Sequence, residues 1–341
     1  MTQSFSRSSR MMQVLGLVLL AAVFLRAVGA SVPNLDSWAD WKYGQWIWEH
    51  KALPGQDPFS PNGGPQRDVR DGRWLADATY YLVETHAGAG GLVLMHALLE
   101  TAKAALFTLA VRRATGSLGM AIIATLIMEA ACWPFFGTVS AATPGQVCWA
   151  ALLLACSGPV PSRMAVVAAP VLVALWANLD PTFAFGLVLL GGLLVGRFLQ
   201  ETRARRALTS AGRDPAVRRL ALMLALSAAA ACANPDGTAG LTLPAARLWG
   251  SQVPVQTWES RALIASALAV LVLLRLSPRP FTAAEILLTT AFGLWAWYDR
   301  GVAPWWLMLA PWLLAPHLQA VLGAVWMGSR QRTPEPPWQH A

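Results

Sequence analysis

The side chains best suited to chemistry are crowded into one stretch near the N-terminus, from Asp36 to Ser60. Its 25 residues hold four tryptophans and four acidic residues, and they follow an apolar run long enough to cross a membrane. A carboxylate in this position, such as Asp36, can hold a metal ion, bind a cationic group or take a proton from an acceptor hydroxyl. Asp36 is also a good helix N-cap, so spacing alone leaves both interpretations open.

Shorter polar clusters interrupt the apolar runs further along the chain. Asn178 and Asp180 lie in WANLDPTFAFG, and Asn234 lies in ANPDG. Polar residues beside Pro or Gly are usual in tight turns, which is the simpler interpretation of both clusters. Two further clusters are Trp258–Glu259 and Asp299–Arg300.

Four charged residues lie within the apolar runs, where charge is costly and often marks a function. They are Glu100, Lys103, Glu129 and Glu285. Glu100 and Lys103 are three residues apart and share a helix face. We expect these two side chains to neutralise each other rather than to form a transport pathway.

Composition assigns most of the chain to a bilayer. Of its 341 residues 55% are hydrophobic and 13% charged, with a mean hydropathy of +0.45. A net charge of +8 in such a chain reflects basic residues retained on the cytoplasmic side rather than a nucleic-acid partner. The four cysteines lack the paired spacing of zinc or redox sites, so we expect them to be packing residues.

Apolar runs predict an all-α fold, a polytopic membrane bundle of about ten transmembrane helices. They lie near 12–31, 88–111, 116–136, 143–158, 164–179, 183–197, 219–233, 262–276, 281–298 and 303–326. The first run could pass for a signal peptide, but Arg26 within it and the lack of a convincing cleavage site favour a retained span. The prediction is one integral membrane domain over residues 1–327 and a cytoplasmic tail over 328–341.

Basic residues predict the orientation. With the N-terminus inside, 16 Lys and Arg fall on the inner side and eight on the outer side, so both termini should be cytoplasmic. All the polar clusters between the runs then fall on the outer face. The outer loop 32–87 should form two interfacial helices around a Pro- and Gly-rich linker, with tryptophans toward lipid and the second helix starting near Arg73. The 17 tryptophans should mostly be interfacial anchors.

The order of residues in this loop resembles the GT-C superfamily of polytopic glycosyltransferase-like proteins, which use polyprenyl-phosphate sugars. The matching residues are Asp36, Trp38, Gly44, Pro54, Asp57, Pro58, Phe59, Ser60, Trp74 and Leu75. LWANLDPTF, ANPDG, TWES and, more loosely, DRGVAP are similar to later family motifs, so the resemblance covers roughly residues 10–325. The chain departs from the family at three positions: Asp40 and Asp180 stand in place of histidine, and Arg73 in place of glutamate.

The resemblance implies transfer of a sugar from a polyprenyl-phosphate carrier to a glycan, lipid or protein acceptor at the outer face of the inner (cytoplasmic) membrane. Asp36 would be the base or a contact to a divalent metal ion, with Asp40 beside it. The residues that line the substrate-binding site would be Asn178, Asp180, Asn234, Arg300, Asp57 and Trp258. Arg300 is the candidate cation for the leaving phosphate, with Arg73, Arg247 and Arg261 as alternatives.

Two other functional classes compete with this one. Because the departures fall at motif positions, the alternative is a catalytically silent GT-C-like scaffold or partner subunit. A transporter would call for charged residues in mid-membrane and usually for repeated halves, and no repeat is visible.

Overall fold

The structure is a computed structural model that describes residues 2–32, 36–54, 58–59, 72–133, 138–140, 142–206, 208–241 and 257–330. Within these ranges, residues 2–9, 36–40, 209–210, 240, 257, 259 and 327–330 are described by their backbone alone. The described residues form helices joined by turns, with one isolated β-bridge between Ser31 and Thr138. The predicted all-α class is confirmed for this part of the chain, and most of the predicted tail lies outside it.

Each apolar run predicted from the sequence falls on one helix. The α-helices are α1 (Thr2–Val28), α2 (Asp36–His50), α3 (Trp74–Thr115), α4 (Leu118–Ala131), α5 (Thr143–Cys156), α6 (Arg163–Leu179), α7 (Phe183–Arg205), α8 (Leu208–Ala211), α9 (Pro215–Ala231), α11 (Thr257–Leu276), α12 (Ala283–Tyr298) and α13 (Ala303–Arg330). Four helical stretches are long and apolar enough to cross a membrane: Arg10–Val28, Trp74–Thr115, Phe183–Arg205 and Arg300–Trp326. These four are compatible with a membrane protein, and ten crossings stay a prediction.

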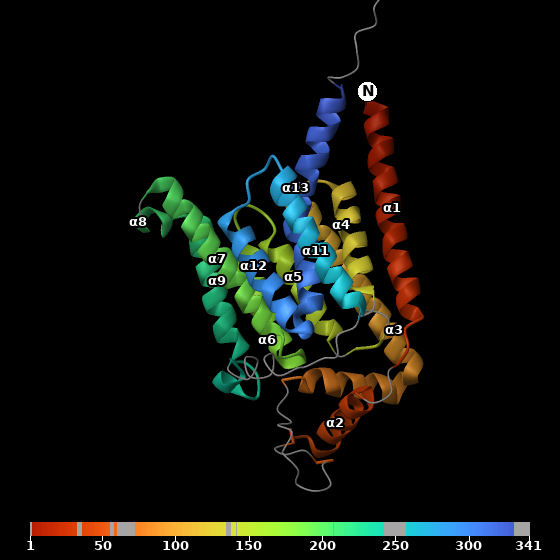
Figure 1. Cartoon of the computed structure of the whole chain (residues 1–341). Coiled ribbons are helices and arrows are strands. Elements are labelled where there is room, and N and C mark those ends of the chain that lie inside the picture. The colour runs from red at the N-terminus through yellow and green to blue at the C-terminus, as the bar shows by residue number, and fades with distance from the viewer. Residues whose placement is uncertain are drawn as a thin grey trace, which may run out of the picture.

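The helices form a bundle with two distinct ends (Figure 1). Helix α1 runs from one end to the other, and α2 and the first part of α3 lie across the far end. Helix α13 returns to the end at which the chain begins, where α8 also lies. We call the end that carries α2 the α2 face and the opposite end the terminal face.

Helix α3 consists of two parts that meet at Gly88. Gly88 has a φ of +63°, a backbone conformation that a Cβ atom disfavours. Residues 74–87 precede this kink and cross the α2 face, and the rest of α3 runs into the bundle. The prediction of a second loop helix beginning near Arg73 is confirmed, because α3 begins at Trp74.

Helix α2 packs on the first part of α3. The indole N–H of Trp41 donates to Glu84 Oε2 at 2.9 Å, and that of Trp48 donates to the Ala78 carbonyl oxygen at 3.1 Å. A Cβ at Gly44 would overlap the backbone of Asp77, so only glycine allows this close approach. Trp41 and Trp48 therefore engage the neighbouring helix, whereas the sequence predicted that they face lipid.

Large aromatic side chains fill the centre of the bundle. The ring centroid of Trp149 lies 6.1 Å from that of Trp176, 5.7 Å from that of Phe292 and 5.8 Å from that of Trp305. Phe185 joins the same cluster, 5.5 Å from Trp305. These rings come from five helices and are almost fully buried, in tilted and edge-to-face pairs that aromatic quadrupoles favour. Trp149, Trp176 and Trp305 are therefore core residues, whereas the sequence predicted that most tryptophans are interfacial anchors.

Candidate functional site

The predicted catalytic carboxylates belong to the first turns of α2. Asp36 is the first residue of this helix and Asp40 follows one turn later, so their backbone lies at the α2 face. Their side chains are outside the described part of the chain, and so is the whole of Asp57. The contacts of these three carboxylates therefore stay predictions.

Asn178 joins three segments at the α2 face. Its Oδ1 accepts a hydrogen bond from Trp74 Nε1 at 2.8 Å, and its Nδ2 donates to the carbonyl oxygens of Ala233 at 2.9 Å and Ala174 at 2.8 Å. These contacts bring the Trp-Leu, Ala-Asn-Leu and Ala-Asn-Pro motifs together, although they are far apart in the sequence. Both amide hydrogens of Asn178 are used, which is the pattern of a residue that holds a scaffold in place.

Asp180 and Asn234 stabilise turns. Asp180 is 5% exposed, and its Oδ1 accepts the backbone N–H of Thr182 at 2.7 Å. Asn234 Oδ1 accepts the backbone N–H of Asp236 at 2.8 Å. Side-chain oxygens that accept a backbone N–H two residues on are typical of Asx turns. The contacts agree with the turn interpretation of both clusters.

Arg300 opens the short 3-10 helix η3 (Arg300–Val302) between α12 and α13. Its guanidinium carbon lies 5.2 Å from the ring centroid of Trp297, a cation–π distance. The neighbouring Asp299 accepts the backbone N–H of Gly301 at 2.9 Å. Among the described residues no hydrogen bond or ion pair joins Arg300 to the predicted partners Asn178, Asp180 or Asn234.

A buried polar cluster joins α3 to the start of α5. Lys103 Nζ is 2.6 Å from Glu100 Oε2 and 3.2 Å from Gln146 Oε1, and the exposed fractions of Lys103 and Glu100 are 0% and 1%. One turn earlier, His96 Nδ1 lies 3.4 Å from Thr143 Oγ1 in the first turn of α5. The predicted Glu100–Lys103 pair is confirmed. His96 was not predicted, although positions 96, 100 and 103 share one helix face and could have indicated it.

A second ionic contact ties α1 to α4. Arg26 Nη1 lies 3.4 Å from Glu129 Oε2, and Arg26 Nη2 donates to the Trp133 carbonyl oxygen at 2.7 Å. The guanidinium carbon also lies 3.9 Å from the ring centroid of Trp133. The end of α1 is thereby held against the end of α4.

Glu285, the fourth charge predicted within an apolar run, lies at the terminal face. It is the third residue of α12 and forms a capping box with Thr282. Its carboxylate lies 2.9 Å from Arg279 Nη2 and 3.3 Å from His317 Nε2. Glu285 thus caps a helix and is paired with basic side chains.

An apolar groove of about 600 Å³ lies between α4, α11 and α13. Helix α13 packs against both α4 and α11 and forms the floor. Trp258 and Arg261 line the end of the groove nearest the α2 face, and Trp258 is 42% exposed. From Trp258 to Leu273 the groove follows α11 for about 22 Å, at 1.5 Å per residue. Of the predicted substrate-binding residues, Trp258 lies in this groove.

A second cavity, of about 580 Å³, opens on the α2 face between α2 and the first part of α3. Trp48 and Lys51 line one wall, and Trp74, Leu75 and Pro235 line the other. The cavity therefore lies where the first loop meets the Ala-Asn-Pro turn.

The described residues contain no group of three or more His, Cys, Asp or Glu side chains that could hold a metal ion. No protein-family model, curated protein or solved structure matches this chain. Its function must therefore be inferred from its residues and its geometry.

Proposed function

We propose that the protein is a GT-C-like membrane glycosyltransferase that moves a sugar from a polyprenyl-phosphate carrier to an acceptor at the outer face of the cytoplasmic membrane. The groove between α4, α11 and α13 is the observation that carries the proposal. It is apolar along its length, and the cationic Arg261 lies at its α2-face end. This pairing suits an isoprenoid chain that ends in a phosphate, because guanidinium groups bind phosphate through charge-assisted hydrogen bonds.

The transfer needs a base and a cation. Asp36 would take the proton of the acceptor hydroxyl while the hydroxyl oxygen attacks the anomeric carbon of the sugar. The bond from that carbon to the phosphate oxygen breaks, and polyprenyl phosphate leaves with its added negative charge stabilised by Arg261, Arg300 or a divalent ion. The acceptor would approach from water through the cavity that Trp48 and Trp74 line.

The proposed membrane orientation rests on where the two termini and the arginines lie in the bundle. The first turn of α1 and the last described turn of α13 lie at the same end, as an even number of crossings requires. The ends of α3 and α7 contribute Arg112, Arg113, Arg203 and Arg205 to the terminal face. Ten crossings with cytoplasmic termini would place these arginines inside and the α2 face outside.

The contacts of Asn178 and Asp180 favour a second candidate, a silent scaffold that binds the carrier without transferring sugar. Both side chains use polar atoms to hold turns and neighbouring segments. Asp40, Arg73 and Asp180 also depart from the family pattern. A scaffold would keep the groove and lose the transfer chemistry.

Reconstitution in liposomes separates the two candidates. The full chain would be supplied with a panel of polyprenyl-phosphate sugars, and released polyprenyl phosphate would be measured together with carrier binding. We expect release by the wild type, no release by Asp36→Asn, and a raised KM for Arg261→Gln. The matched control is Arg275→Gln, because Arg275 lies on the same helix in its last turn, outside the groove.

Each outcome assigns the protein differently. Carrier binding that depends on Arg261 without release of the lipid phosphate would assign it to the scaffold class. Neither binding nor release across the panel would contradict both candidates.

A further inference from the structure

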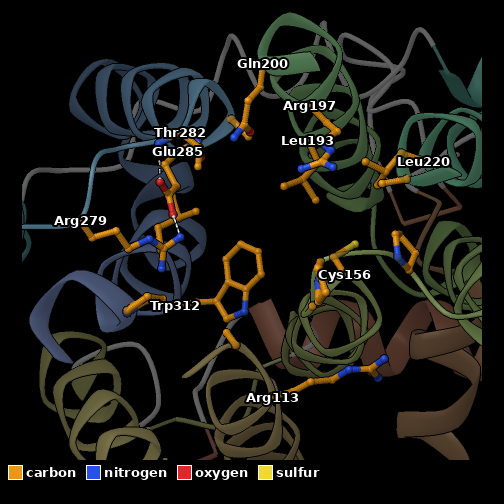
Figure 2. Close-up of a pocket in the computed structure, with 18 residues that line it drawn as sticks. Arg113, Cys156, Leu193, Arg197, Gln200, Leu220, Arg279, Thr282, Glu285 and Trp312 are labelled. Carbon is orange, nitrogen blue, oxygen red and sulfur yellow. Dashed lines mark hydrogen bonds and ion pairs between the residues drawn. The ribbon is translucent and has the colours of Figure 1, made fainter. Parts of the chain in front are cut away.

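The terminal face holds a cavity of about 430 Å³, at the opposite end of the bundle from the proposed transfer site. The ends of α3 and α5, the turn 158–161, helices α7 and α13 and the starts of α9 and α12 enclose it. Its volume falls within the range of roughly 300–1,000 Å³ that small-molecule sites occupy. Trp312, Leu193 and Leu220 contribute an apolar surface, and Figure 2 shows the Trp312 indole lying at its centre.

Basic side chains dominate the charged lining. Three arginines, Arg113, Arg197 and Arg279, line the cavity together with one carboxylate, Glu285. They come from three separate elements: the end of α3, α7 and the segment before α12. The positive-inside rule accounts for arginines at this end of the bundle, but not for their convergence on one cavity.

Two of these arginines are held in place by carboxylates. Arg197 Nη2 lies 2.9 Å from Glu201 Oε1, and Arg197 Nε lies 3.5 Å from Asp214 Oδ1. Arg279 Nη2 donates to Glu285 Oε1 at 2.9 Å. A guanidinium carries five N–H donors, so each arginine keeps donors that these contacts do not use. In Figure 2 the two side chains extend from different walls toward the middle of the cavity.

The third arginine has no partner among the described residues. Arg113 is exposed, lines the cavity beside Gly158, and forms no hydrogen bond or ion pair with any residue that the structure describes. Glu201 is shared between Arg197 and Arg205, Asp214 also contacts Arg197, and Glu285 contacts Arg279. With Arg113 included, four arginines face three carboxylates, so this end of the cavity keeps one positive charge. A cavity with an uncompensated cation and two arginines already oriented is suited to an anion.

We propose that this cavity binds a phosphate group, carried either by a small soluble phosphate ester or by the headgroup of an anionic lipid. Guanidinium groups match the geometry of phosphate oxygens and can bind them through paired hydrogen bonds. Because carboxylates already hold Arg197 and Arg279, less side-chain freedom is lost when the ligand binds. Trp312 and Leu193 would contact the less polar part of the ligand.

Arg113 and Arg112 provide a matched pair for the test. They are neighbours at the end of α3, both exposed and both without a described side-chain partner, but only Arg113 lines the cavity. The full chain would be placed in phosphatidylcholine nanodiscs and titrated calorimetrically with pyrophosphate and with glycerol 3-phosphate. We expect saturable binding that Arg113→Ala weakens about tenfold, the loss of one charge-assisted contact, and that Arg112→Ala leaves unchanged.

A lipid arm separates the two sources of phosphate. The same proteins would be prepared in phosphatidylglycerol nanodiscs and examined by native mass spectrometry for retained lipid. If pyrophosphate or glycerol 3-phosphate still binds the protein in phosphatidylglycerol nanodiscs, the ligand is a soluble phosphate ester. Retained phosphatidylglycerol that is lost in Arg113→Ala but kept in Arg112→Ala identifies a headgroup. The proposal is overturned if neither source binds, or if the two variants bind equally well.

Discussion

The indole N–H of Trp74 donates to the side-chain oxygen of Asn178 at 2.8 Å, across a sequence separation of 104 residues. This bond attaches the first part of α3 to the end of α6, and Asn178 continues the connection to Ala233. The α2 face is therefore held together by side chains from segments that are distant in the chain.

Removing this bond should lower the free energy of unfolding. Trp74→Phe keeps an aromatic ring but deletes the N–H donor with the pyrrole part of the indole, and we expect a loss of about 1 kcal/mol or more in detergent. Asn178→Ala also removes the side-chain donor from the carbonyl groups of Ala174 and Ala233, and should cost about 1–3 kcal/mol. Tyr298→Phe is the control, since Tyr298 is 74% exposed and makes no hydrogen bond that the structure describes. Additive losses in the double variant would show that the two residues are not coupled.

The Glu100–Lys103 pair should be far more sensitive to single changes than a surface pair. Either Glu100→Gln or Lys103→Met leaves one buried charge without its partner, and we expect each to cost about 3–5 kcal/mol of stability. The double variant should lose less than the sum, because no unpaired charge remains. Arg205→Ala, which breaks a half-exposed pair with Glu201, should cost under about 1 kcal/mol. Equal losses at the two sites would contradict burial as the cause.

The proposed orientation can be tested with reporter fusions. A reporter fused after Arg206 should lie in the cytoplasm, and one fused after Gly63 should lie outside, because arginines are retained on the inner side. A fusion after Arg330 should match the first. If the reporters after Arg206 and Gly63 lie on the same side, the assignment of the α2 face as outer is wrong.

Asp214 should stabilise the fold in a pH-dependent way. Burial acts to raise the pKa of its carboxyl, but the backbone N–H groups of Val217 and Ala216 and the guanidinium of Arg197 outweigh burial and hold the pKa below its usual value. A lowered pKa means that the stabilisation is present above about pH 4, near the unfolded value, and is lost as the pH falls through the folded value.

The variants for this prediction separate the charge from the cap. Asp214→Ala should lose about 1 kcal/mol at pH 7, and Asp214→Asn less, since asparagine also caps helices. The difference in melting temperature between the wild type and either variant should shrink as the pH falls below about 4. A difference that stays constant from pH 7 to pH 3 would show that the carboxylate charge does not contribute.

The sequence by itself determined where the helices lie and how short segments close on themselves. Apolar runs of this length must form helices in a bilayer, because each backbone N–H and C=O needs a partner within the segment. The Glu100–Lys103 pair and the turns at Asp180 and Asn234 could also be predicted from the sequence, because the interacting residues lie within four positions of each other. The start of α3 at Trp74 belongs to the same class of local feature.

Only the tertiary structure decided which faces of these helices meet. It paired Arg26 with Glu129, buried Trp149 and Trp176 in the core, and left an apolar groove beside α11 and a basic cavity at the terminal face. The physical reason is that lipid tails are as apolar as the side chains that helices bury against one another. In a helix of a water-soluble protein, a polar face marks the side toward water. Here both faces are apolar, so the fit between side-chain shapes determines which helices pack together.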